Sequence, residues 1–131
     1  MQFKIPKNNE RYHWTLHSIE KMKFYGLSEQ KVLGIVKRPK RKEEGIVKNT
    51  IAVMQPASVK TTAGKAVWKS ELWVMYQTKK NKNKKNLSDL QKLLFKDQIK
   101  IISAWRYPGV SPEQNPIPEE ILREISESGL K

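Results

Sequence analysis

The segment spanning residues 13–45 constrains the fold most strongly, because it predicts two short helices joined by a tight turn. Ser18 is the residue type expected at the N-cap of the first helix, and Gly26 supplies the left-handed residue that ends it. Ser28 then caps a second helix, which Pro39 terminates because the residue before a proline disfavours the helical conformation. The segment therefore predicts a compact pair of helices with one shared apolar side.

We expect the second helix to run to Lys37, with Gly34 in its interior. A glycine at this position costs about 1 kcal/mol relative to alanine. Close packing of the helix against a sheet would explain a glycine at this position.

Segments on both sides of the helices predict a small sheet. The run RYHWTLH, residues 11–17, is rich in aromatic and β-branched residues and predicts a short strand. Three further strands are expected over residues 45–55, 65–78 and 99–107, and the second of these is apolar on both sides, as a central strand is. The polar stretch 56–64 suits a hairpin loop.

The remaining segments predict two more helices and a division of the chain. Residues 87–97 suggest a short helix, and Pro118 suits the first turn of a last one. The expected fold is α+β, with two N-terminal helices packed on a small, mostly antiparallel sheet and a C-terminal helix. A length of 131 residues allows one core. We expect a basic domain over 1–109 with a lysine-rich insertion at 79–98, followed by an acidic tail and helix over 110–131.

The charge of the chain is strongly positive and uneven. The formal net charge is +13, and residues 1–109 carry 24 basic and 8 acidic side chains whereas residues 110–131 carry 2 and 5. Two runs, KRPKRK at 37–42 and KKNKNKK at 79–85, concentrate the cations. A charge run is often only a solvated surface, and Glu43 and Glu44 are natural charge partners of the first run. Two runs in a basic body nevertheless favour phosphate contacts. The predicted nucleic-acid-binding residues are Lys37, Arg38, Lys40, Arg41, Lys42, Lys79, Lys80, Lys82, Lys84 and Lys85.

Several classes of protein are disfavoured by what the sequence lacks. It has no cysteine, two histidines and no metal-binding motif, so we expect no metal site and no cofactor. It has no secretory signal and no apolar run of 18 residues, so we expect a cytoplasmic protein without membrane contact.

His17 and Lys21 are the candidates for chemistry. Cleavage of RNA by its own 2'-hydroxyl needs a base, cations for the phosphate and an acid, and it needs no metal. His17 lies near a helix start, where the helix dipole disfavours protonation of the imidazole. It could therefore act as the base. Lys21 follows one helical turn later. The alternative is structural: in it His17 hydrogen-bonds within the fold and Lys21 is a solvated helix residue. His13 is assigned to structure, and the four tryptophans are assigned to core and sheet packing rather than to a base-stacking platform.

The helical segment also resembles an uncharacterised bacterial domain family in the RelE/ParE toxin superfamily, close to BrnT-like ribonuclease toxins. Phe24 and Tyr25 depart from the pattern, because many relatives carry an arginine just before the glycine. The residues that carry the resemblance are His17, Lys21, Met22, Gly26, Leu27, Ser28, Val32, Pro39, Arg41, Glu43 and Gly45.

This resemblance implies a RelE/ParE-like fold with helices on one sheet face and the other face available to RNA. It also implies that Arg106 and Tyr107 lie near a cleavage site with His17 and Lys21. RNA or the ribosome is then the expected partner, with an acidic antitoxin-like protein as a second one. The sequence leaves open whether the domain is a metal-free ribonuclease, a non-catalytic nucleic-acid or ribosome-associated module, or an interaction domain for an acidic protein. It also leaves the oligomeric state open.

Overall fold

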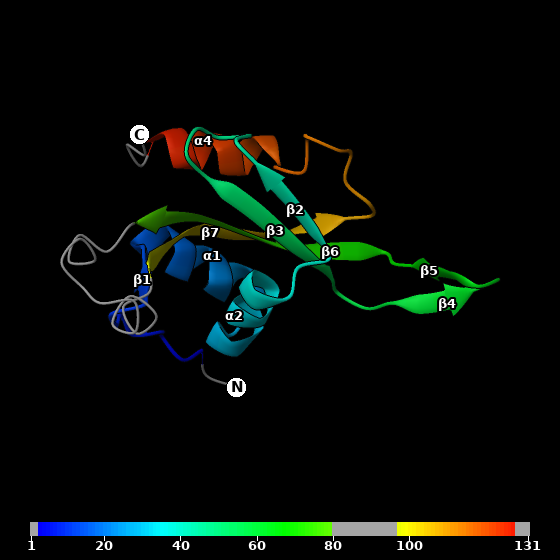
Figure 1. Cartoon of the computed structure of the whole chain (residues 1–131), viewed down its shortest axis with the longest axis horizontal. Helices are drawn as coiled ribbons and strands as arrows, with labels where there is room; N and C mark the ends of the chain where they lie inside the picture. The colour runs from blue at the N-terminus through cyan, green and yellow to red at the C-terminus, as the bar shows by residue number, and fades with distance from the viewer. Residues whose placement is uncertain (1–2, 80–96, 128–131) are drawn as a thin grey trace, which may run out of the picture.

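A five-stranded mixed sheet lies at the centre of the computed structural model, which describes residues 3–79 and 97–127 (Figure 1). Its strand order is β1-β7-β6-β3-β2, in which β1 runs parallel to β7 and the other neighbours are antiparallel. The strands are β1 (Tyr12–Trp14), β2 (Arg41–Glu44), β3 (Ile51–Pro56), β6 (Ser70–Lys79) and β7 (Gln98–Pro108). A separate hairpin of β4 (Lys60–Thr62) and β5 (Lys65–Val67) extends from β3 and β6.

The described residues form three helices, so the expected α+β class is confirmed. Helices α1 (Leu16–Tyr25) and α2 (Glu29–Lys37) lie on one face of the sheet, and α4 (Glu119–Glu127) lies on the other (Figure 1). Buried side chains of α1 and α2 meet those of the strands in one apolar cluster: Trp14, Met22, Leu27, Val32, Ile35, Val53, Leu72, Val74, Tyr76, Ile99, Ile101 and Ala104.

The turn between α1 and α2 agrees with its sequence signals. Gly26 has φ 69° and ψ 37°, which is the left-handed conformation expected at the end of α1. The Ser28 hydroxyl accepts the Lys31 N–H at 3.1 Å and caps α2, which ends at Lys37 as expected. The predicted start of α1 was wrong: Thr15 is the N-cap and accepts the Ser18 N–H. The observed strand β1, Tyr12–Trp14, is therefore shorter than the predicted strand over residues 11–17.

The strand β2 was not predicted, because its four residues are all charged. Pairing with β3 directs them alternately to the two faces of the sheet. Arg41 and Glu43 point to the α4 side, where Glu43 is buried, whereas Lys42 and Glu44 are exposed and form an ion pair at 3.4 Å. The predicted strand 65–78 is interrupted at residues 68–69, where the chain passes from the hairpin into the main sheet.

Helix α4 covers the sheet face that was expected to be available to RNA, so that expectation was wrong. Ile121 and Ile125 of α4 are buried against strand residues of this face, including Trp73 and Trp105, whose rings stack at 6.0 Å. Trp105 also donates its Nε1–H to the Pro116 carbonyl at 3.0 Å. Residues 117–125 of the expected acidic tail and helix are thus packed on the sheet.

The expectations about membrane-spanning helices and about residues 80–97 are limited by the ranges that the structure describes. No helix there is long and apolar enough to cross a membrane. The expected helix at 87–97, and Lys80, Lys82, Lys84 and Lys85, fall outside the described residues apart from Asp97.

Candidate nucleic-acid interface

The predicted base His17 lies in the first turn of α1 and is held by contacts within the fold. Its Nε2 is 2.9 Å from the Ser103 hydroxyl of β7, and its Nδ1 is 3.7 Å from a carboxylate oxygen of Glu124 on α4. Lys21 Nζ lies 2.7 Å from the other Glu124 oxygen. Burial lowers the pKa of His17 below 6.5, and the nearby Lys21 cation lowers it further, although Glu124 and Glu20 oppose the shift. The lowered pKa favours the neutral imidazole, and burial is its largest cause.

The contacts of His17 bring together a hydroxyl, an imidazole and a carboxylate, which is the chemical set of a nucleophilic triad. Ser103, however, has no exposed surface. A nucleophile must reach its substrate, and this hydroxyl lies beneath α4 on the covered side of the sheet. The cluster of His17, Lys21, Ser103 and Glu124 therefore joins α1, β7 and α4. It supports the structural alternative for both predicted catalytic residues on helix α1.

Arg106 and Tyr107 are not brought to His17. Arg106 is in register with Leu72, which belongs to the α1 and α2 side of the sheet, whereas Ser103 beside His17 faces the α4 side. Tyr107 does face the α4 side and packs on its apolar cluster. Four residues separate it from Ser103 along β7, or about 13 Å in a strand. The four predicted catalytic side chains therefore do not converge on one phosphate-sized site.

Arg41, a predicted phosphate contact, is directed into the fold. Its guanidinium donates to the Ser111 carbonyl and hydroxyl, both at 2.9 Å, and lies 5.1 Å from the Trp73 ring centre. It is also 3.6 Å from an oxygen of Glu71, which has no exposed surface. Arg41 thus ties the segment after β7 to the sheet, and little of its charge is left for a phosphate.

Glu71 is the buried counterpart of this arginine and was not predicted from the sequence. Its oxygens accept from Trp68 Nε1 at 2.9 Å, Trp73 Nε1 at 3.0 Å, and the Ser111 N–H and hydroxyl at 3.1 and 2.6 Å. Burial by itself raises the pKa of this carboxyl, but the hydrogen bonds from Ser111 and the tryptophans outweigh it and bring the pKa below 4.5. The signal in the sequence was an acidic residue two positions before a core tryptophan.

Three cations of the first basic run and one from β7 lie at one end of the sheet, which we call the basic end: Lys37, Arg38, Lys40 and Arg106. Gln55 at the end of β3 donates to the Arg38 carbonyl at 2.8 Å, which fixes the end of α2 over this strand. Gln55, Leu72 and Arg106 are in register across three strands, so Arg106 lies at the same end and on the same face as α2. The side chains of all four cations are exposed, and none forms an ion pair with a carboxylate among the described residues.

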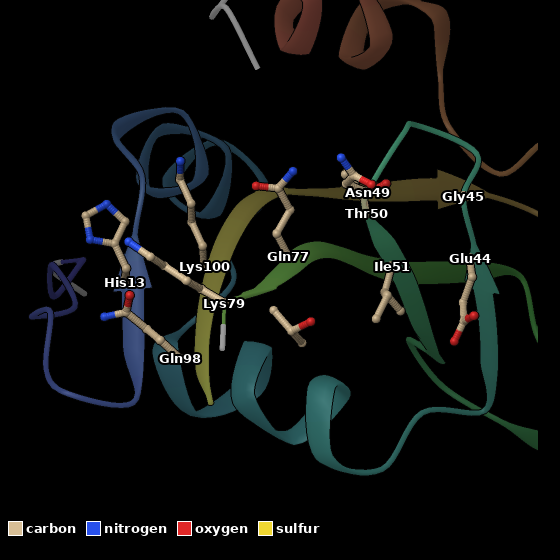
Figure 2. A pocket seen from close by; sticks show the side chains of 11 residues that line it. His13, Glu44, Gly45, Asn49, Thr50, Ile51, Gln77, Lys79, Gln98 and Lys100 are labelled. Atoms are coloured by element: carbon tan, nitrogen blue, oxygen red, sulfur yellow. The ribbon is translucent and has the colours of Figure 1, made fainter. Parts of the chain in front are cut away.

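A second basic feature lies at the opposite end of the strands. His13, Lys100 and Gln77 are in register across β1, β7 and β6 and line a cavity of about 850 Å³ together with Asn49 and Lys79 (Figure 2). Gln77 and Lys100 point toward the side on which α4 lies (Figure 2). Lys79 is the described member of the second lysine run. Two ammonium groups and three amides line the cavity together with one carboxylate, that of Glu44, so its cationic and amide groups can accept an anion.

Comparisons with family models, curated proteins and solved structures found no match to this chain.

Proposed function

We propose that this protein is a non-catalytic nucleic-acid-binding module that contacts the phosphate backbone through the basic end of its sheet. The observation that carries the proposal is that Arg106, distant in the sequence, lies at the same end of the sheet as Lys37, Arg38 and Lys40. All four cations are exposed and have no carboxylate partner among the described residues. Such a cluster in a chain of net charge +13 favours binding to a polyanion.

A ribonuclease function is less well supported than binding. The imidazole of His17 contacts Ser103 and Glu124, and Arg106 projects from the other face of the sheet. The proposed relation to the RelE/ParE superfamily rests on the residue pattern of the segment 13–45. We keep it as a hypothesis about ancestry and draw no chemistry from it.

Binding can be tested by fluorescence anisotropy with labelled single-stranded RNA, RNA duplex and DNA duplex over a range of salt concentrations. Each phosphate neutralised contributes about 0.7 to the log-log salt slope for a single strand and about 0.9 for B-form DNA. The triple variant Lys37→Gln, Arg38→Gln, Lys40→Gln should lower the slope by about 2 or more.

The matched control removes three exposed charges from other places: Lys7→Gln, Lys23→Gln, Arg123→Gln. It changes the net charge equally, so it should reproduce the general electrostatic loss only. If both triple variants weaken binding to the same extent, the basic end is not the contact surface. If the wild-type protein binds none of the three nucleic acids, the alternative of an acidic protein partner for the same cations takes the place of this proposal.

A further inference from the structure

The hairpin of β4 and β5 projects beyond the main sheet at the basic end (Figure 1). β4 begins shortly after Pro56, and β5 leads into Ser70 after two residues, so the hairpin continues β3 and β6 outward. Every residue from 58 to 67 is exposed. A two-stranded ribbon of this kind is only marginally stable in water and adds little to the core. Its extension away from the body suits contact with a partner.

The charge of the hairpin identifies the kind of partner. Residues 45–70 contain four lysines and no aspartate or glutamate, and Lys60, Lys65 and Lys69 lie on the hairpin and its base. The next carboxylate, Glu71, is fully buried and occupied by its hydrogen bonds. The hairpin and the basic end from which it projects therefore present one sign of charge.

The side chains of the hairpin are distributed unequally between its two faces. Lys60 lies opposite Val67 and Thr62 lies opposite Lys65, so both lysines share one face in diagonal positions. The other face carries Thr61 opposite Ala66, which are both small. A ribbon with small residues on one face can approach another surface closely, while the lysines reach outward from the other.

The tip of the hairpin is narrow. Only Ala63 and Gly64 connect the strands, with φ 52° and 78°. Two successive positive φ values are the mark of a type I′ turn, whose twist matches that of the strands. No bulky loop therefore widens the end of the ribbon.

We propose that this hairpin is an arm that enters the major groove of a B-form DNA duplex, with Lys60 and Lys65 on the flanking phosphates. The inference rests on the proposed nucleic-acid function and specifies its target. The major groove of B-form DNA is about 12 Å wide and admits a two-stranded ribbon, whose backbones are about 5 Å apart. Three residue pairs rise about 10 Å, comparable to the groove depth of about 8.5 Å. The major groove of A-form RNA is too narrow for such an arm.

The test uses the full chain with Lys60→Gln and Lys65→Gln together, and a second variant, Thr62→Glu, which places a negative charge between the two lysines. All three positions are exposed, so folding should be unaffected, which circular dichroism and urea unfolding check. The probes are a 20-base-pair DNA duplex, an RNA duplex of the same sequence and the single RNA strand. The matched control is Lys7→Gln with Lys23→Gln.

For the DNA duplex, the double variant should weaken binding about tenfold at 0.1 M salt and lower the salt slope by about 2, because two phosphate contacts are lost. Thr62→Glu should weaken it as well. Binding of the single RNA strand should change no more than in the control. If the double variant loses affinity equally for all three probes, or loses none for the DNA duplex, the proposal that the hairpin enters the major groove is refuted. A dimer in light scattering that the double variant dissociates, with DNA binding intact, would make a second copy of this chain the occupant instead. Wild-type protein that binds no probe would refute the proposed function itself, which is a different result.

Discussion

Replacing Glu71 with glutamine should destabilise the protein severely, although the two side chains have almost the same shape. Glu71 has no exposed surface and accepts hydrogen bonds from Trp68, Trp73 and Ser111, with the Arg41 guanidinium 3.6 Å away. A glutamine can accept on one side only. If its carbonyl takes the position that faces Ser111 and Trp73, its NH₂ group meets the Trp68 N–H and Arg41, which are both donors.

The size of the effect follows from the number of bonds. Three hydrogen bonds change from charge-assisted to neutral, which costs about 1 kcal/mol each, and the Trp68 bond is lost outright. The Arg41 guanidinium also loses one of its two carboxylate neighbours and keeps Glu43 at 3.3 Å. We therefore expect a loss of about 3–5 kcal/mol, most of it from the four hydrogen bonds of the carboxylate. That is a large share of the total stability of a domain, roughly 5–15 kcal/mol.

Urea unfolding followed by tryptophan fluorescence measures this loss, because two of the donors are indoles. The control is Glu44→Gln on β2, the same substitution in an exposed pair with Lys42, which should cost less than about 1 kcal/mol. The pKa of Glu71 is below 4.5 in the folded protein, so its contribution is complete at neutral pH and lost as the pH falls below 4.5 through that lowered pKa. A Glu71→Gln cost as small as that of Glu44→Gln would refute the network as a source of stability.

Three further outcomes are expected. Gly26→Val should cost at least about 1 kcal/mol in urea unfolding, because a β-branched residue is strained at φ 69°. Gly34→Ala should instead gain about 0.5–1 kcal/mol, since the nearest atom to an added Cβ is the flexible end of Arg38 at 3.4 Å; any loss would reveal a contact that this geometry lacks. The pKa of His17, followed by NMR titration, should lie below 6.5 and fall further in Glu124→Gln, because Glu124 raises it. The stability that neutral His17 contributes is complete above pH 6.5 and lost as the pH falls through its lowered pKa. An unchanged His17 pKa in Glu124→Gln would contradict the electrostatic contact between Glu124 and His17.

The parts of the fold that were predictable depend on local signals. Gly26 and Ser28 determine the turn through their own backbone and side chain, and the sequence therefore places it correctly. The charged strand β2 depends instead on pairing with β3, and no local propensity favours RKEE as a strand. The position of α4 likewise depends on the distant tryptophans of β6 and β7. The spacing of Ile117, Ile121 and Ile125 was the available signal for a buried helix face.

The residues of the candidate site were likewise predictable only where a local sequence signal marked them. Lys37, Arg38 and Lys40 were found as a run in the sequence, and they remain exposed in the structure. Arg41, in the same run, could not be separated from them, because only strand pairing shows that its side chain faces the interior. Ser103 was missed altogether, since nothing local connects it with His17, 86 residues earlier.

The parallel pairing of β1 with β7 has a consequence for how the chain folds during synthesis. The Thr15 hydroxyl, at the N-cap of α1, donates to the carbonyl of Ile101, 86 residues later in the chain. Helix α1 packs mainly on β7, so its principal docking surface is absent until most of the protein has been made. Contacts of such long range slow folding, because a large loop must close before they form. The antiparallel pairing of β3 with β6 spans far fewer residues and can form earlier. We expect the N-terminal helix to be the last element of its face to become protected from hydrogen exchange.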